Sequence, residues 1–476
     1  MQVRKKSLSL GLTVACAAVL TGVALLVAGC TSNLAGSSVG TTVNAATATV
    51  PMVVTDAPSD QLVAASLTLN SIVLTDSTGA TASVLSTPET FEATHLDAVQ
   101  EPLFSPAIPE DTYTSVTLTY ANPVVYYVDT TTKQVVEATS TLANTTQTIT
   151  FATPLVVNKT TTSLLVDYLV ANSVALSGST ATVTPAFHVT IAPISAQPTN
   201  GTNGLLCGVK GKITALGTSS FTITDGKGIS MTLAVNSSTL FQNLTSFSDL
   251  EVGMLVEADI QIQSDGSLLA VRVDEEAAPK AAMQLLVGHV TSVTGSPATS
   301  FTELVHQNVG GASTTTSSVV TDTITLNSST VFELPGRFTK LSGGVAPFAA
   351  VFSASTIFAG QSVSVATTGV TSNAATAVKV RLNPQTVHGT IASINTTGGN
   401  TVYTLTLPSG HWLATLTGLS TVTVYANGNQ QAINSTSPAV GSNIRFNGFL
   451  FNVGGKLILL ADVQADPPGS PIAPVI

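Results

Sequence analysis

Short segments in which apolar and polar residues alternate dominate the chain from Val53 onward. Examples are Leu67-Thr68-Leu69, Val116-Thr117-Leu118-Thr119-Tyr120 and the stretch 183–191, all bounded by Pro, Gly, Asn or Asp. A period of two with such borders predicts β-strands. Helical periodicity is brief, around 89–99 and 275–284, and the second stretch is expected to be a linker that coils into one or two turns. The pattern predicts an all-β protein.

The second half of the chain repeats one pattern three times. Each copy opens with a glycine, one spacer residue and an Ile or Val, at Gly211, Gly288 and Gly389. A closing glycine and the end of the last strand lie at 253 and 273, 360 and 380, and 441 and 463. Those spacings of 20, 20 and 22 residues predict three copies of one domain.

Each copy holds about five or six strand-like runs, enough for a small closed barrel. The opening glycine is expected in the first strand, where a side chain would crowd the neighbouring backbone. A middle signature follows, NSSTLF at 236–241, NSSTVF at 327–332 and the weaker Thr423-Val424-Tyr425. Copy two carries extra Ser, Thr, Gly and Ala at 295–318 and 333–354, which we expect to form loops.

The expected order along the chain is an N-terminal β-domain followed by three small β-barrel repeats. The expected organisation is a lipoprotein signal peptide at 1–29, a flexible tether at 30–49, the N-terminal β-domain at 50–192, a linker at 193–205, barrel repeats at 206–276, 285–383 and 386–467, and a Pro-rich tail at 468–476.

The repeats resemble the bacterial family known as domain of unknown function 5666. The resemblance rests on the opening motif, the Thr-[LV]-[FY] strand, the later Val-Gly and the closing apolar strand, and residues 206–276 fit it best, with Glu251-Val252-Gly253 and 265–270 (DGSLLA). It implies barrels similar to the oligonucleotide/oligosaccharide-binding fold. It implies no activity, because the function of that family is not established.

The N-terminal block resembles a lipoprotein family known as domain of unknown function 4382. The matching residues are 53–58 (VVTDAP), Ile72-Val73-Leu74, and Ile108-Pro109 followed by 113–116 (YTSV). Family members usually have a glycine shortly before that tyrosine, where this chain has Glu110-Asp111. The resemblance implies an antiparallel β-sandwich and again no activity.

The first thirty residues have the layout of a secretory signal: basic residues at 4–6, an apolar run from Leu8 to Ala28, and Val27-Ala28-Gly29-Cys30. The apolar run alone is also long enough for a retained membrane helix. Small residues before Cys30 favour cleavage and a diacylglycerol on its thiol, with two or three acyl chains as a stable membrane anchor. We therefore expect an extracytoplasmic envelope lipoprotein, and Thr31, in place of Asp, favours the outer membrane in a two-membrane host.

Loss of residues 1–29 removes three of the 16 basic residues and none of the 26 acidic ones, which leaves a formal charge of −13. Nucleic acid and anionic lipid headgroups are therefore poor partners. The remaining classes of partner are an envelope protein and a polysaccharide, and the sequence does not identify which molecule it is. With Cys16 cleaved and Cys30 acylated, no cysteine pair is left for a disulfide, and Cys207 is expected to be a half-buried strand residue rather than a reactive thiol.

Motifs for common chemistry are missing. The sequence has no H-E-x-x-H, no P-loop and no dinucleotide G-x-G-x-x-G after a strand. Its six histidines are scattered singly, so no zinc centre is expected. Charged residues make up only 9% of the chain.

Acidic residues offer a speculative calcium loop at Asp56, Asp60 and Asp97, with Glu89, Glu92, His95 and Glu101 near the last of these. The favoured alternative is a solvated acidic loop in which Asp56 forms an Asx turn ahead of Pro58. Trp412, beside His411, is a weak candidate for stacking on a sugar ring, and its favoured alternative is a core position.

Duplicated domains without a shared polar constellation favour a spacer, scaffold or weak binding protein over an enzyme, without deciding between them. The alternative is an envelope hydrolase or carbohydrate-active protein with its site in the sandwich, around Asp56, His95 and Asp97.

Overall fold

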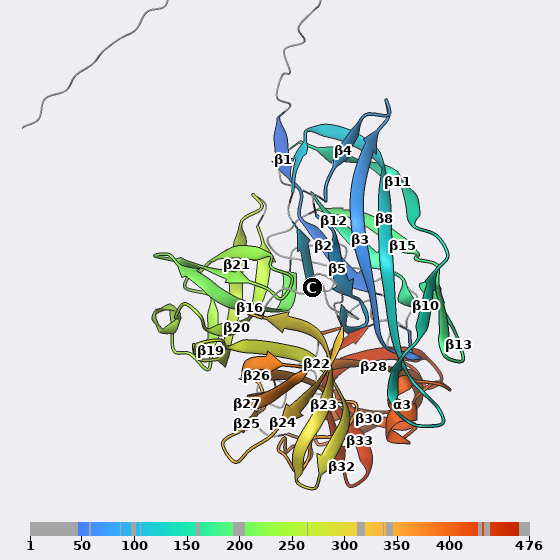
Figure 1. Cartoon of the computed structure of the whole chain (residues 1–476), viewed down its shortest axis with the longest axis vertical. Coiled ribbons are helices and arrows are strands. Elements are labelled where there is room, and N and C mark those ends of the chain that lie inside the picture. Colours follow the sequence, from blue (N-terminus) through green and yellow to red (C-terminus); the bar gives the residue numbers. More distant parts are fainter. Residues whose placement is uncertain are drawn as a thin grey trace, which may run out of the picture. The chain divides into compact units, whose positions relative to one another are not determined.

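The computed structural model describes residues 46–465, apart from 57–58, 86, 97–100, 105, 159–161, 194–204, 264, 312–318, 337, 339–345, 427–430 and 433–437. The described residues form β-sheets almost throughout, so the protein is all-β (Figure 1). The expected signal peptide, Cys30, the Pro-rich tail and Asp97 lie outside the described residues. In the part that is described, no helix is both long and apolar enough to cross a membrane.

The N-terminal domain, blue to green in Figure 1, is a β-sandwich. One sheet contains β11 (Thr146–Val157), β8 (Asp111–Val128), β3 (Leu62–Asp76) and β4 (Thr81–Ser83), with β5 (Glu89–Glu92) on β3 and β9 (Val135–Glu137) on β8. The other contains β15 (Phe187–Pro193), β12 (Thr162–Tyr168), β2 (Met52–Asp56) and β6 (Glu101–Phe104). Alternating apolar residues of both sheets, such as Leu67, Leu118, Val54 and Val166, share one core.

Smaller elements complete this domain: β1 (Thr47–Thr49) pairs with β7 (Ala107–Pro109), and β10 (Thr139–Leu142), β14 (Thr180–Val183) and β13 (Val174–Ser177) form another sheet. A 3-10 turn (Thr94–Leu96) and α1 (Val170–Ser173) connect strands. The β2–β12 and β10–β14 pairs are parallel. Because β1 is paired, β-structure reaches back into the stretch expected to be tether.

The repeats follow in chain order, from green to red in Figure 1. The strands of repeat 1 are β16 (Leu205–Leu216), β17 (Ser220–Thr224), β18 (Ser230–Ala234), β19 (Leu240–Gln242), β20 (Leu255–Ile262) and β21 (Leu268–Ala277), with a 3-10 turn at Phe247–Asp249. Those of repeat 2 are β22 (Gln284–Gly295), β23 (Ala298–Val309), β24 (Val320–Thr325), β25 (Val331–Glu333), β26 (Ser362–Thr371) and β27 (Ala374–Leu382). Repeat 3 has β28 (Gln385–Thr397), β29 (Asn400–Thr406), α3 (Trp412–Thr417), β30 (Thr421–Ala426), β31 (Gln431–Ala432), β32 (Asn443–Val453) and β33 (Lys456–Ala465).

All three repeats have one topology. In repeat 1 the order is β18-β17-β16-β20-β21, and a parallel β18–β21 pairing closes the barrel. The β24–β27 and β30–β33 pairings close repeats 2 and 3 in the same way. A three-strand meander closed by a parallel pair is the arrangement of an OB-like barrel, so the predicted fold class is confirmed.

The two glycines of each repeat have the same roles. The amide of the closing glycine donates to the carbonyl of the third residue of the opening motif, Gly253 to Ile213 at 2.8 Å, Gly360 to Val290 at 2.7 Å and Gly441 to Ile391 at 2.8 Å. The closing glycines have φ values of +93°, +111° and +90°, which favour glycine. A Cβ on the opening Gly288 would lie 2.2 Å from the carbonyl oxygen of Leu304, which explains that glycine.

Two local expectations are wrong, and a third needs correction. Thr423-Val424-Tyr425 lies in β30, the third barrel strand, whereas the middle signatures of the other repeats lead into the fourth strands β19 and β25. The insertion at 295–318 is not all loop, because Ala298–Val309 forms β23. The linker expected at 275–284 is shorter than predicted, since β21 continues to Ala277 and β22 begins at Gln284, and it holds a single turn at 281–282.

Hydrophobic clusters connect the sandwich and the repeats. Val53 and Leu165 of the sandwich pack into the core of repeat 1. Val63 and Val128 pack with Leu304 of repeat 2 into the core of repeat 3. Because apolar burial is the main source of stability, these contacts hold the four domains together as one packed unit.

Candidate functional site

Five of the six histidines, all six of which lie among the described residues, are gathered where the domains meet. We call the set of His95, His289, His306, His388 and His411 the histidine junction. The ring centroids are 4.2 Å apart for His95 and His306 and 6.4 Å apart for His306 and His289. Trp412 continues the chain of rings, 5.3 Å from His289 and 6.2 Å from His411. The sixth histidine, His188, is exposed on β15.

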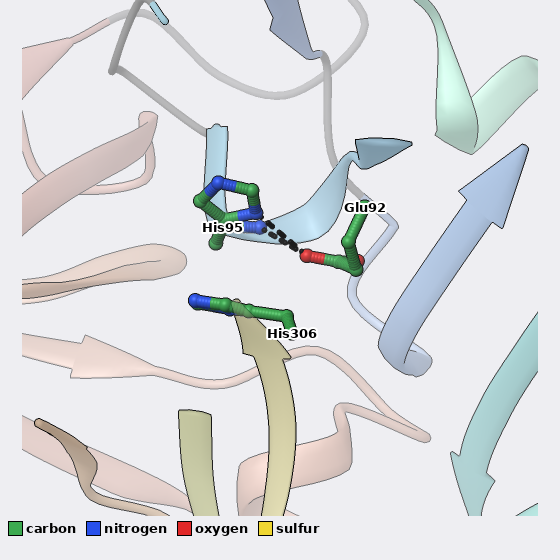
Figure 2. Close-up of side chains that lie close together, drawn as sticks. All are labelled: Glu92, His95 and His306. Carbon is green, nitrogen blue, oxygen red and sulfur yellow. Dashed lines mark hydrogen bonds and ion pairs between the residues drawn. The ribbon is translucent and has the colours of Figure 1, made fainter. Parts of the chain in front are cut away.

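Two histidines of this junction, His95 and His306, lie close to the carboxylate of Glu92 (Figure 2). Glu92 ends β5, His95 lies in the following 3-10 turn, and His306 lies on β23 of repeat 2. One ligand atom from each lies within 4.8 Å of the others, and in the described part of the chain no other group of three or more Asp, Glu, His or Cys residues meets this spacing. The group therefore offers one oxygen and two nitrogen donors.

The carboxylate of Glu92 is fixed by the backbone around it. Its Oε1 accepts hydrogen bonds from the amides of Ala65 and Thr94, both at 2.8 Å, and from the Thr94 hydroxyl at 2.8 Å. Its Oε2 accepts from the His95 amide at 3.1 Å and faces His95 Nδ1 at 2.8 Å. With 2% of its side chain exposed, Glu92 is held in one position.

His95 lies between two carboxylates. Its Nδ1 donates to Glu92, and its Nε2 donates to Glu101 Oε1 at 3.0 Å. The other oxygen of Glu101 accepts from Lys227 Nζ at 2.8 Å. An Asx turn holds Lys227, since Asp225 Oδ1 accepts from the amides of Lys227 and Ile229. The network thus joins the sandwich to repeat 1.

The electrostatics of the pair of stacked imidazoles are asymmetric. Burial opposes the charge of His95, but Glu101 and Glu92 outweigh burial and raise the pKa of His95 to about 9. Burial, together with the charge of His95, lowers the pKa of His306 to about 3. For Glu92, the hydrogen bond and charge of His95 outweigh burial and lower the pKa to about 2. At neutral pH a cationic His95 therefore lies against a neutral His306.

A second group surrounds Asp60. His388 Nδ1 donates to Asp60 Oδ1 at 2.9 Å, and His411 Nε2 lies 3.9 Å from the same oxygen. His411 caps α3, because its Nδ1 accepts from the amide of Leu413 at 3.1 Å. Burial lowers the pKa of His411 to about 4. An Asp–His pair of this kind can hold an imidazole in one tautomer.

Two pockets reach the junction from different directions. One is lined in part by Asp60, His95, His289, His388, His411 and Trp412. The other, of about 590 Å³, is lined in part by Glu92, His95, Glu101, Lys227, His306 and Asp322. His95 lines both pockets, and Glu92 and His306 line the second, so all three side chains of the group reach the larger space.

Two of the three expected calcium ligands, Asp56 and Asp60, have other partners in the structure. Asp56 is fully buried in β2, where its Oδ1 accepts from the Val170 amide at 3.1 Å, so it belongs to a strand rather than a loop. Asp60 bonds to His388, and Asp97 lies outside the described residues. Among the described residues, neither Asp56 nor Asp60 belongs to the group of possible metal ligands formed by Glu92, His95 and His306.

The other candidates have clear positions. Trp412 begins α3, is 9% exposed and belongs to a hydrophobic cluster, and one edge of it lines a pocket. Its contact with a sugar stays a prediction. Cys207 lies half-buried in β16. The sequence pattern singled out Glu92 and His95. It did not indicate His306, because the stretch around it was expected to be a loop. The signal for a strand there was the two-residue spacing of Phe301, Glu303 and Val305, which places them on one face.

Comparisons with known proteins are few. None of the curated proteins matches the chain. A solved structure titled "drosophila Unr CSD456" is similar over 55% of this chain and 97% of that one, at 9% identity and a TM-score of 0.13, which is too low to support an argument. The expected resemblance to domain of unknown function 4382 has no matching family. Residues 210–274, nearly all of repeat 1, match the family described as Domain of unknown function (DUF5666).

Proposed function

We propose that this chain is a lipid-anchored extracytoplasmic protein of the cell envelope that acts as a scaffold, spacer or binding protein rather than as an enzyme. The signal layout and Cys30 support the extracytoplasmic, lipid-anchored location, and Thr31 favours the outer membrane of a two-membrane host. The N-terminal resemblance to domain of unknown function 4382 agrees with this location and brings no activity.

The observation that supports a non-enzymatic role is a set of buried ion pairs that join one domain to the next. Arg381 of repeat 2 is 1% exposed and forms ion pairs with Asp274 and, at 3.2 Å, with Glu276 of repeat 1. Glu276 is also bound by Lys210 at 2.8 Å. In a chain with so few charges, these groups fix one domain against the next, which suits a preassembled surface more than separate modules.

A partner for such a surface is an envelope protein or a polysaccharide. The formal charge of −13 expected after cleavage disfavours nucleic acid and anionic membrane surfaces.

One observation favours a second candidate, an envelope hydrolase or carbohydrate-active protein. The Asp60–His388 pair faces a pocket, and His388 Nε2 has no hydrogen-bond partner among the described residues. Such a pair can act as a general base. This site would lie at the histidine junction, and not around Asp56 in the sandwich. Loss of a measurable hydrolytic activity in a folded Asp60→Asn variant would overturn the scaffold proposal.

The experiment for the proposal is expression of the full chain and of Cys30→Ala with labelled fatty acid. We expect the wild-type chain to incorporate label, to fractionate with membranes and to be cleaved by protease added outside the inner membrane. The variant is expected to stay an unlabelled precursor. Labelling of Cys30→Ala, or a wild-type chain recovered unlabelled in the cytoplasm, would contradict the proposed anchor.

A further inference from the structure

The Glu92–His95–His306 group has a donor set for a divalent transition metal. Two imidazoles and one carboxylate, from the sandwich and from repeat 2, bring their ligand atoms within 4.8 Å of one another. Zn²⁺ is bound by nitrogen and oxygen at about 2.0–2.2 Å, so tetrahedral ligand atoms lie about 3.4 Å apart. Glu92 and His95 are both held by hydrogen bonds, whereas His306 Nδ1 has no hydrogen-bond partner among the described residues. Binding of one ion therefore requires the His306 ring to turn out of the stack on His95, because the lone pairs of imidazole nitrogens lie in the ring plane.

His306 supplies an independent observation. Its Nδ1 is buried and has no hydrogen-bond partner among the described residues. A buried polar atom without a partner is destabilising, so proteins rarely keep one without a use. The same side chain is stacked on His95, with an interplanar angle of 30°, which places it beside the other ligands (Figure 2).

The surroundings of His95 match a metal-ligand environment. Metal-bound histidines usually donate their second ring N–H to a carboxylate, and His95 Nε2 donates to Glu101, which Lys227 holds in turn. His95 Nδ1 and Glu92 Oε2 then face each other at 2.8 Å, in a position where a metal can replace the shared proton. The pocket of about 590 Å³ gives access and leaves room for a water as a further ligand.

We propose that Glu92, His95 and His306 bind one divalent transition-metal ion, with Zn²⁺ as the fitting representative, and that Glu101 orients His95 as an outer-shell partner. Carboxylate and imidazole donors without thiolates suit Zn²⁺, Co²⁺ and Ni²⁺ better than Ca²⁺, which takes six to eight oxygen ligands. This proposal does not depend on how the chain is anchored, and the anchoring experiment does not test it.

The test uses the full chain, purified in detergent and freed of metal by a chelator and dialysis. Zn²⁺ binding is measured by calorimetry, and Co²⁺ is added as a spectroscopic probe of the ligand geometry. We expect one tight site per chain, a Co²⁺ spectrum of low-symmetry coordination that Zn²⁺ abolishes, and a rise in Tm with Zn²⁺.

Three variants make the test specific. His306→Phe keeps a ring against His95 but removes a ligand, and affinity should fall by more than about 100-fold. Glu101→Gln keeps all three ligands but weakens the outer-shell partner of His95, and affinity should fall by about 10–100-fold. The control His188→Ala changes an exposed histidine on β15 and should bind as the wild type does.

Circular dichroism verifies folding of each variant, and His306→Gln replaces His306→Phe if the latter does not fold. Unchanged affinity in a folded His306 variant, or no Zn²⁺ uptake by the wild type, would overturn the proposal.

Discussion

The imidazole of His306 stacks on that of His95, with ring centroids 4.2 Å apart. His95 belongs to the sandwich and His306 to the long second strand of repeat 2. The equivalent strand of repeat 1, β17, covers only Ser220–Thr224, so the extra length of β23 in repeat 2 is what carries a histidine to the sandwich. A feature of one repeat thus creates a contact that the other repeats do not make.

The Lys227–Glu101 ion pair, which joins repeat 1 to the sandwich, gives the first prediction. Both side chains are 12% exposed. Lys227→Met leaves the Glu101 carboxylate with His95 as its remaining cation among the described residues, so the cost should lie below the ~3–5 kcal/mol of a buried pair that loses its single partner. We expect a clear loss of Tm in thermal unfolding of the full chain. The double variant Lys227→Met/Glu101→Gln should recover most of it, and a double variant as unstable as the sum of both singles would show that the pair is not coupled.

Arg381 gives the second prediction. Its guanidinium is 1% exposed and pairs with Asp274 and Glu276 across the boundary between repeats 1 and 2. Arg381→Met should destabilise the protein by about 3–5 kcal/mol, because Asp274 then keeps a cation only at 3.5 Å, in Arg272, and Glu276 keeps only Lys210 among the described residues. Lys379→Met is the matched control on the same strand, since Lys379 is 19% exposed and pairs only with Glu333 among the described residues. Its cost should stay within about 1 kcal/mol. Equal losses in denaturant unfolding would contradict the burial argument.

The equivalent positions of the closing glycines could be predicted from the sequence, because their spacing to the last strand recurs in each repeat. Gly253 bonds to Ile213, and Gly360 and Gly441 make the same bond in their repeats. Strand order within a repeat was harder to read. Thr423-Val424-Tyr425 has the same Thr-Val-aromatic pattern as the signature strands, and such a pattern fits any half-buried strand, so it was assigned to the wrong one.

The site could be predicted only in part. Glu92, His95 and Glu101 are close in sequence, and their clustering in the chain indicated a polar site. His306, His388 and Lys227 reach it through the packing of repeats against the sandwich, which no local pattern encodes. The depressed pKa of His306 likewise has burial as its main cause, and burial depends on the neighbouring domain.

A graded series at the opening glycines gives the third prediction. A Cβ on Gly288 would lie 2.2 Å from the backbone oxygen of Leu304, whereas a Cβ on Gly211 would meet the side chain of Ile223 at 2.8 Å. The atom met at Gly211 is the Cβ of Ile223, which also moves only with its backbone, but the longer separation there needs a smaller shift. Gly288→Ala should therefore lower Tm more than Gly211→Ala, and the latter should cost about 1–3 kcal/mol. The order of the two Tm values is the measurement, and the reverse order would show that the backbone at Leu304 yields more easily than the backbone at Ile223.

Glu303 gives the fourth prediction, which concerns pH. It is fully buried on β23, paired in register with Asp322 of β24, and its carboxylate oxygens have no hydrogen-bond partner among the described residues. Burial, with the charge of Asp322, raises the pKa of Glu303 well above its ordinary value of 4.5. Between that value and the raised pKa, the folded protein binds more protons at this site than the unfolded chain does. The contribution of Glu303 to the free energy of unfolding is therefore fully present below pH 4.5 and falls as pH rises through this window.

Glu303→Gln removes this titration, because the amide is close in shape to the protonated carboxyl and stays neutral. We expect the variant to have a higher Tm than the wild type at about pH 8 and a similar Tm at about pH 4. Glu251→Gln, at an exposed position in repeat 1, should show no such pH-dependent difference. A Glu303→Gln variant that follows the wild-type pH profile would mean that Glu303 titrates alike in the folded and unfolded chains, which its burial between β22 and β24 does not allow.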